Sequence, residues 1–211
     1  METARADRSF TPILSTPPAR PTLPNTPAAM MTRALPLLLA VALAVPASAQ
    51  MRAADEARVS PNARIGTTVG TTEVDVTYGR PSLRDRSYFT DGSDLAPAGD
   101  VWRTGANEAT TIAFSSDVMM NGERIPAGTY SLFTIPGDEW TVILNATPQQ
   151  WGAYRYDAEQ DVARFTALPM DNAPMQEQFE IRFQDVMEDS ATMILHWGTV
   201  GVPVTITRAA M

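Results

Sequence analysis

Polar and apolar residues alternate over several short segments from about residue 58 onward, with the period of two that is typical of half-buried β-strands. The strictest alternation runs through residues 73–78, Glu-Val-Asp-Val-Thr-Tyr. Because successive side chains of a strand point to opposite faces, Val74, Val76 and Tyr78 are expected to face a hydrophobic core. Residues 179–183, Phe-Glu-Ile-Arg-Phe, show the same pattern and predict another strand of this kind.

A hairpin is predicted at Asn121-Gly122, which separates two short extended segments. Asn and Gly both tolerate the positive φ angles of a two-residue turn, so residues 118–120 should pair with residues 123–125. Residues 191–197 and 202–206 should form a closing antiparallel pair. Pro203 favours an edge position for the second of these strands, because proline cannot donate a hydrogen bond to a neighbour. Further strands rich in β-branched and aromatic residues are predicted at 129–135 and 140–144.

The predicted elements are about nine or ten short strands separated by Gly, Pro and Asn turns, without a convincing helical period. This pattern indicates an all-β protein, either an antiparallel β-sandwich or a jelly-roll-like fold. A single β domain is expected over residues 58–207, followed by a short tail at 208–211. One long loop, Arg80–Ala109, interrupts the strands, and loops of this length inside a domain often carry function.

The residues before this domain have a different character. Residues 1–30 hold six of the 17 prolines and show no hydrophobic period, so they are expected to be disordered or to result from a mis-assigned start. Residues 31–49 combine an arginine, an apolar run and Ala47-Ser48-Ala49, which is the layout of a secretory signal peptide cleaved near Ala49. Residues 50–57 would then be a short linker. The alternative is an N-terminal membrane anchor that stays attached.

Export would place the mature protein in the periplasm or outside the cell, with no stable membrane span after cleavage, since the apolar run is shorter than the roughly 20 residues of a spanning helix. The chain has no cysteine, which excludes disulfides, thiolate metal sites and cysteine nucleophiles. Its only histidine, His196, cannot supply a multi-imidazole zinc site and is expected to be structural. No metal and no cofactor are therefore expected.

The charge of the chain argues against nucleic-acid binding. The formal net charge is −8, and from Gln50 onward 22 Asp and Glu residues face 12 Arg. Contacts to phosphates need a basic surface, which this composition does not provide.

Candidate ligand-binding residues lie mainly in the long loop, where several arginines occur in an otherwise acidic domain. An arginine fork can bind a carboxylate or phosphate with two hydrogen bonds. The alternative is that these arginines pair with nearby carboxylates and fix the loop to the sandwich; Arg103 and Glu108 would then meet across a turn at Gly105. Trp102 and Trp151 could stack on a sugar ring or pack in the core. Residues 151–154 lie outside the clear strands and are therefore expected to be more exposed than Trp102. The candidates are Arg80, Arg86, Trp102, Arg103, Asn107, Glu108 and Trp151.

Two long motifs, residues 101–110 (VWRTGANEAT) and 126–136 (PAGTYSLFTIP), resemble a bacterial family known as a domain of unknown function, DUF2911. The resemblance covers about residues 58–207. It implies export and a β-rich fold, and it brings no established activity and no catalytic residues. Shorter matching pieces are Ser60-Pro61, Ile65-Gly66, residues 76–81, Arg86 with Phe89, Trp140 with residues 144–145, and residues 151–152 with Tyr156.

Three functional hypotheses follow from these residues. The first is a non-catalytic binding module for a small anionic or carbohydrate-like ligand, bound by the long loop with an aromatic side chain as a stacking surface. The second is a hydrolase or isomerase acting on a small polar substrate, with Glu108 as acid or base and Arg103 stabilising negative charge. The third is a structural envelope protein without a small ligand.

Overall fold

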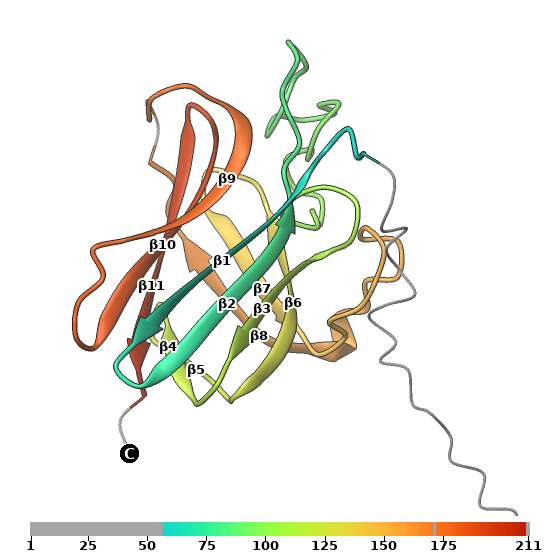
Figure 1. Cartoon of the computed structure of the whole chain (residues 1–211). Helices are drawn as coiled ribbons and strands as arrows, with labels where there is room; N and C mark the ends of the chain where they lie inside the picture. The colour runs from blue at the N-terminus through green and yellow to red at the C-terminus, as the bar shows by residue number, and fades with distance from the viewer. Residues whose placement is uncertain (1–56, 171, 210–211) are drawn as a thin grey trace, which may run out of the picture. The chain divides into compact units, whose positions relative to one another are not determined.

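The chain folds into two antiparallel β-sheets, shown in Figure 1 by a computed structural model that describes residues 57–170 and 172–209. The expectations for residues 1–56, including the signal peptide and linker, lie outside these residues, as do positions 171, 210 and 211. Over the described part, no helix is long and apolar enough to cross a membrane.

The larger sheet has six strands in the order β1-β2-β3-β6-β7-β8. Every neighbouring pair in it is antiparallel. A three-residue 3-10 turn, η2 (Ala158–Gln160), precedes the last strand. The strands are β1 (Asn62–Val69), β2 (Thr72–Gly79), β3 (Thr110–Phe114), β6 (Gly128–Ile135), β7 (Trp140–Asn145) and β8 (Asp161–Ala167).

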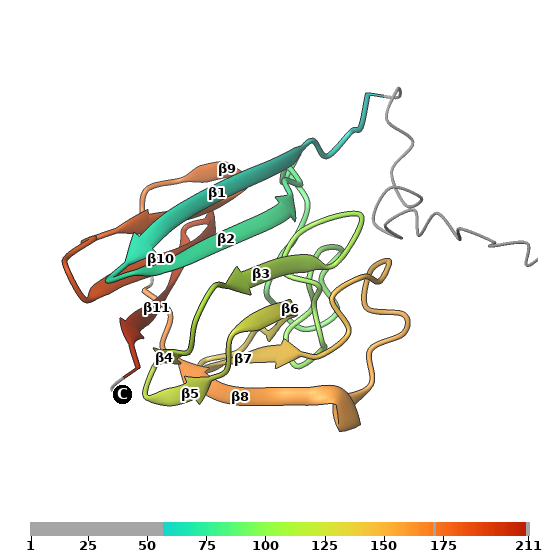
Figure 2. The same ribbon diagram turned by 60° about the horizontal axis from the view of Figure 1, so that its bottom comes forward.

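The smaller sheet has five strands in the order β5-β4-β11-β10-β9 and is also antiparallel throughout. Figure 2 shows its long strands next to β1 and β2 of the larger sheet. The strands are β4 (Val118–Met120), β5 (Glu123–Ile125), β9 (Gln176–Gln184), β10 (Ser190–Gly198) and β11 (Val200–Arg208).

Together the sheets confirm the expected antiparallel β-sandwich, with eleven strands in the described residues against the nine or ten predicted. Side chains from both sheets share one hydrophobic core. Val74, Val76 and Tyr78 are buried in it, as the alternation along β2 predicts. Met193 and Leu195 of β10 supply part of the opposite wall. Burial of such apolar area is the main stabilising contribution in a chain without disulfides.

The hairpin at Asn121-Gly122 is confirmed. Val118 pairs with Ile125 and Met120 with Glu123, and both turn residues have positive φ, 46° for Asn121 and 92° for Gly122. Two short strands therefore meet through a turn that few other residue pairs could form without strain.

The expectation that Pro203 marks an edge strand is wrong, because β11 lies between β10 and β4. The pairing nevertheless explains how proline is tolerated there. Pro203 is opposite Ile194 of β10, whereas β4 pairs only with residues 206–208 of β11. At Pro203 the strand thus has a ladder neighbour on one side, and the missing N–H costs no hydrogen bond in the sheet.

The loop between β7 and β8 folds back over the outer face of the larger sheet. Phe133 and Ile143, which point away from the main core, are fully buried there. Ala153 and Tyr156 of the loop pack against them, and the Phe133 and Tyr156 rings are 5.1 Å apart. The centre of this sheet is therefore buried on both faces. The path of the β7–β8 loop also places residues 146–157 beside the long loop.

The long loop covers one end of the sandwich, opposite the turn between β1 and β2 (Figure 1, green). Its backbone approaches Gly79 so closely that a Cβ atom at this position would overlap the carbonyl oxygen of Ala106. Trp102 also forms two backbone hydrogen bonds with Thr134 of β6, at 2.7 and 2.9 Å. The loop is thus fixed to the strands by backbone contacts.

Candidate functional site

The arginines at the start of the long loop bond to backbone carbonyls. Arg80 Nε donates to the carbonyl oxygen of Phe179 at 3.2 Å. Arg86 donates to the carbonyl oxygens of Leu83 and Ser82, at 3.1 and 2.8 Å. Neither forms an ion pair among the described residues, so the expected pairing of these arginines with loop carboxylates is wrong. The reason is that the loop and the end of β9 leave carbonyl oxygens that no strand satisfies.

Glu108 pairs with Arg58, not with Arg103 as the structural alternative predicts. The two terminal nitrogens of Arg58 donate to the two carboxylate oxygens of Glu108, at 2.5 and 2.9 Å. Both side chains are mostly buried, with exposed fractions of 22% and 17%. The hydrogen bonds to Glu108 raise the pKa of Arg58 above its ordinary value. This two-pronged pair does not favour the use of Glu108 as a catalytic acid or base.

Asn107 strengthens the same attachment. Its side-chain amide donates to the carbonyl oxygen of Ser60 at 2.9 Å, and its φ angle of 64° lies in the left-handed region that asparagine tolerates. Asn107 and Glu108 together therefore hold residues 58–60 against the long loop.

Trp102 lies in the core. Only 6% of its surface is exposed, and its ring stacks on that of Trp197 with a centroid distance of 5.7 Å and an interplanar angle of 11°. Phe89, Trp140 and Phe179 surround the same ring at 5.1 to 6.4 Å. This placement favours the core-packing alternative for Trp102 over a role as a stacking wall.

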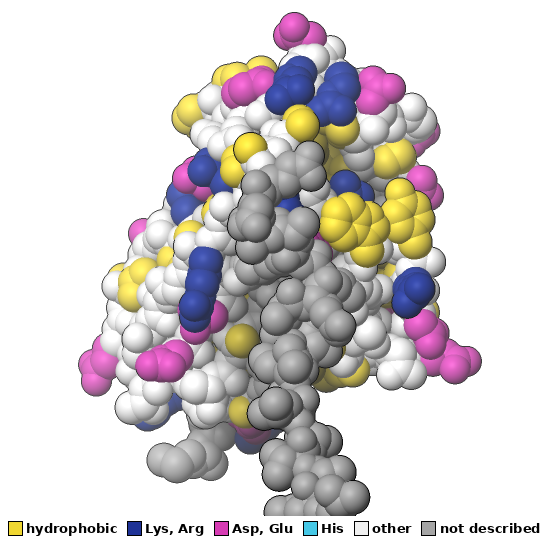
Figure 3. All heavy atoms as spheres, turned by 45° about the vertical axis from the view of Figure 1, so that its right-hand side comes forward, with side chains coloured by type: hydrophobic (Ala, Val, Ile, Leu, Met, Phe, Trp, Pro, Cys, Tyr) yellow, Lys and Arg dark blue, Asp and Glu magenta, His cyan; other side chains and the backbone are white. Residues whose placement is uncertain are grey.

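Trp151 and Tyr154 are exposed, as expected for residues 151–154. Their exposed fractions are 52% and 86%. Backbone hydrogen bonds from Ala109 to Gln150 and from Gly152 to Asn107, at 2.9 and 3.0 Å, set Trp151 directly opposite Glu108. Side chains at opposing positions of such a bridge lie on the same side of the two segments. Figure 3 turns this side of the molecule forward and shows hydrophobic side chains projecting beside basic ones.

Arg103 is the one candidate with an unsatisfied charge. Its Nε atom is buried and has no hydrogen-bond partner, and no ion pair in the described part of the chain includes it. Burial lowers the pKa of its guanidinium from the ordinary value, and the nearby phenol of Tyr154 partly offsets this. A partly desolvated guanidinium without a partner is prepared to accept an anion.

The structure therefore separates the predicted candidates into two sets. Trp151 and Tyr154 are exposed on the loop after β7, where Trp151 is opposite Glu108 and Tyr154 lies near enough to Arg103 to affect its pKa. Arg80 and Arg86 are engaged elsewhere in the loop, and Trp102 is in the core. Arg58 was missed by the sequence reasoning. It lies 50 residues from Glu108, so no local pattern could indicate the pair.

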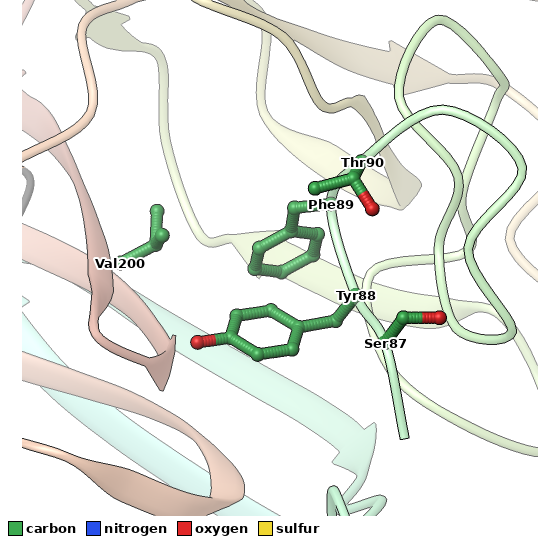
Figure 4. Close-up of a pocket in the computed structure, with 5 residues that line it drawn as sticks. All are labelled: Ser87, Tyr88, Phe89, Thr90 and Val200. Atoms are coloured by element: carbon green, nitrogen blue, oxygen red, sulfur yellow. The ribbon is translucent and has the colours of Figure 1, made fainter. Parts of the chain in front are cut away.

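A separate hollow of about 400 Å³ lies at the start of the long loop, beside the turn between β10 and β11. Figure 4 shows the rings of Tyr88 and Phe89 pointing toward Val200 in this hollow. The Tyr88 hydroxyl accepts a hydrogen bond from the backbone N–H of Thr199 at 3.2 Å, and Phe89 packs on Trp140. These rings anchor the loop on the core.

The single histidine is structural, as expected. His196 is 4% exposed, and both ring nitrogens are within 2.9 Å of a partner, Arg182 on one side and the carbonyl oxygen of Pro174 on the other. Because arginine can only donate and a carbonyl can only accept, the ring proton must lie on Nε2. In the described residues no group of three or more histidine, cysteine, aspartate or glutamate side chains is placed to hold a metal ion.

The comparisons with known proteins agree with the motifs in these loops. A family model described as "Protein of unknown function (DUF2911)" matches residues 60–206. No curated protein and no solved structure matches the chain significantly. Since the matched region runs from before β1 to residue 206 of β11 and includes both loops of the candidate site, the chain belongs to the DUF2911 family.

Proposed function

We propose that this protein is a non-catalytic binding module for a small anionic or carbohydrate-like ligand. The observation that carries the proposal is Arg103, whose partly buried guanidinium has no partner among the described residues. Desolvating a charge without compensation is unfavourable, and a bound carboxylate or phosphate would supply the compensation. Trp151 and Tyr154 provide exposed aromatic surface in the adjacent loop, on which an apolar sugar face can stack.

The conformation of the long loop supports a functional role for this region. Six residues without the freedom of glycine have positive φ angles between 80 and 109. Such conformations are unfavourable and tend to collect at functional sites, where the surrounding structure enforces them. The residues are Arg84, Asp85, Phe89, Ala96, Thr104 and Asn107.

The other two hypotheses find less support. A hydrolase or isomerase needs a carboxylate free to exchange a proton, and both oxygens of Glu108 already accept hydrogen bonds from Arg58. A purely structural protein accounts for Arg80, Arg86 and Asn107, which all bond to the backbone. It does not account for Arg103, whose buried Nε atom has no hydrogen-bond partner in the described part of the chain.

The experiment is a titration of the full chain with glucuronate, glucose and citrate, followed by calorimetry and tryptophan fluorescence. Arg103→Gln should weaken binding of an anionic probe by about tenfold or more, since it removes a charge-assisted hydrogen bond. Arg64→Gln is the matched control, because Arg64 is an exposed arginine of β1 paired with Asp75. Equal affinity in the wild type and Arg103→Gln would reject Arg103 as the ligand's partner.

We also propose that the protein is exported. The support is the signal-peptide layout of residues 31–49 and the position of the family match, which begins at residue 60, after the expected cleavage site.

A further inference from the structure

A second hollow, of about 500 Å³, opens at the end of the sandwich opposite the long loop. It lies between the β1–β2 turn, the β3–β4 connection and the end of β11. Thr72 begins β2 and Gly79 ends it, so the eight residues of this strand separate the hollow from the long loop by roughly 25 Å. Its polar wall consists of the hydroxyl groups of residues 71–72 and 115–116 and the charged side chains of Asp117, Arg124 and Arg208.

The carboxylate in this wall is already engaged. One oxygen of Asp117 accepts the backbone N–H of Ala127 at 2.9 Å, and the other accepts from Arg124 at 2.9 Å. The backbone hydrogen bond and then the arginine lower the pKa of Asp117, so this carboxylate is ionised and its charge is balanced inside the wall.

The groups that remain are hydrogen-bond donors. Arg208 approaches Asp189 only to 3.6 Å, which is an ion pair between two exposed side chains without a hydrogen bond. Ser115 accepts the backbone N–H of Glu73 at 2.8 Å, which leaves its own hydroxyl hydrogen available. Thr72 and Ser116 share one hydrogen bond of 2.5 Å, so one of their two hydrogens is also available.

We propose that this hollow binds a phosphate or sulfate group, either as the free ion or as an ester on a small molecule. Sulfate has only hydrogen-bond acceptors and a phosphate group has mainly acceptors, so either matches a wall whose unused groups are the Arg208 guanidinium, the remaining N–H groups of Arg124 and several hydroxyls. The charges of Arg124 and Arg208 are offset by Asp117 and Asp189, so the proposal depends on the N–H and hydroxyl groups that these pairs leave unused. The volume exceeds that of the ion alone and leaves room for the organic part of an ester.

The test is a nuclear magnetic resonance titration of the full chain at constant ionic strength, with inorganic phosphate and with glycerol phosphate as probes and chloride as the reference salt. The chemical shifts of residues around the hollow should change with probe concentration and reach saturation. Arg208→Gln should weaken binding by about tenfold. Arg124→Ala should weaken binding further, because it also leaves the Asp117 carboxylate without its arginine, and the negative charge of Asp117 then repels the anion. Tighter binding of glycerol phosphate identifies an ester as the occupant, and equal binding identifies the free ion.

Arg64→Ala is the control, since it also breaks an exposed arginine–aspartate pair but lies outside the hollow. It should bind both probes as the wild type does, and melting curves should show that all variants are folded. Three results overturn the proposal: no saturable shift with either probe, unchanged affinity in Arg208→Gln, or a loss in Arg64→Ala as large as that in Arg208→Gln. Because Arg103 takes no part in this site, the outcome is independent of the function proposed above.

Discussion

The arginines of this domain differ in the groups that their guanidinium ions bind. Arg80 and Arg86 use their N–H groups to satisfy carbonyl oxygens of irregular backbone, and Arg58 forms a two-pronged pair with Glu108. Arg103 is partly buried like Arg58 but has neither kind of partner in the described residues. Arginine is thus structural at three positions, and at a fourth it has no partner in the described part of the chain.

Stability measurements distinguish these roles. Glu108→Ala should lower the free energy of unfolding by about 2 kcal/mol, because it leaves the mostly buried Arg58 without its charged hydrogen bonds. Arg103→Ala should leave the free energy near the wild-type value, since it removes a desolvated charge that has no described partner. Denaturant unfolding of both variants provides the comparison. If Arg103→Ala destabilises as much as Glu108→Ala, Arg103 is a structural residue and the binding proposal loses its main support.

At the scale of elements, local patterns identified the strands well. The alternation of Val74, Val76 and Tyr78 and the Asn121-Gly122 turn predicted β2 and the β4–β5 hairpin, because period and turn geometry are properties of adjacent residues. The position of β11 inside its sheet was not predicted, since it depends on pairing with β4, more than 80 residues earlier. The attachment of the long loop at Gly79 and the Arg58–Glu108 pair are likewise contacts between distant segments, which no local pattern encodes.

Another such contact ties the loop after β7 to β8. The Tyr156 hydroxyl donates to Asp161 at 2.6 Å and accepts from Arg164 at 3.0 Å, while Arg164 also pairs with Asp161. Burial first, and then the hydrogen bond to Asp161, raise the pKa of Tyr156 to about 12. The neutral phenol is therefore part of the native arrangement of this loop, which carries Trp151 and Tyr154 on its surface.

This arrangement predicts a loss of stability in alkali. In the unfolded chain the Tyr156 phenol ionises near its ordinary pKa of 10.0, whereas the folded state keeps the proton up to about 12. The folded state thus binds more protons in this window, so stability is complete below about pH 10 and falls as pH rises toward about 12. Melting temperatures over this range should fall less steeply in Tyr156→Phe than in the wild type. If the melting temperatures of the wild type and Tyr156→Phe fall in parallel, Tyr156 does not contribute to the loss of stability in alkali. In Tyr156→Phe, part of the fall in melting temperature with pH should remain, because burial also raises the pKa values of Tyr78 and Tyr130.

At the scale of the whole molecule, the two proposed sites lie at opposite ends of one sandwich. Strand β2 runs from Thr72, at the hollow proposed to bind an oxyanion, to Gly79 beneath the long loop. The core between them contains buried side chains from both sheets, with an aromatic group around Trp102 and Trp197 near the long loop. A rigid core of this kind allows loops at each end to bind different ligands without mutual adjustment.

The proposed export concerns the whole chain, and it yields a prediction about processing. Signal peptidases require small residues at the first and third positions before the cleavage site, which Ala49 and Ala47 provide here. N-terminal sequencing of protein expressed with its own leader in a bacterial host should therefore begin at or near Gln50. Ala47→Asp and Ala49→Asp should each prevent cleavage and leave residues 31–49 attached, whereas Ser48→Asp, at the unconstrained middle position, should be processed normally. Recovery of wild-type protein that retains residues 31–49 would contradict the signal-peptide interpretation and favour an N-terminal membrane anchor.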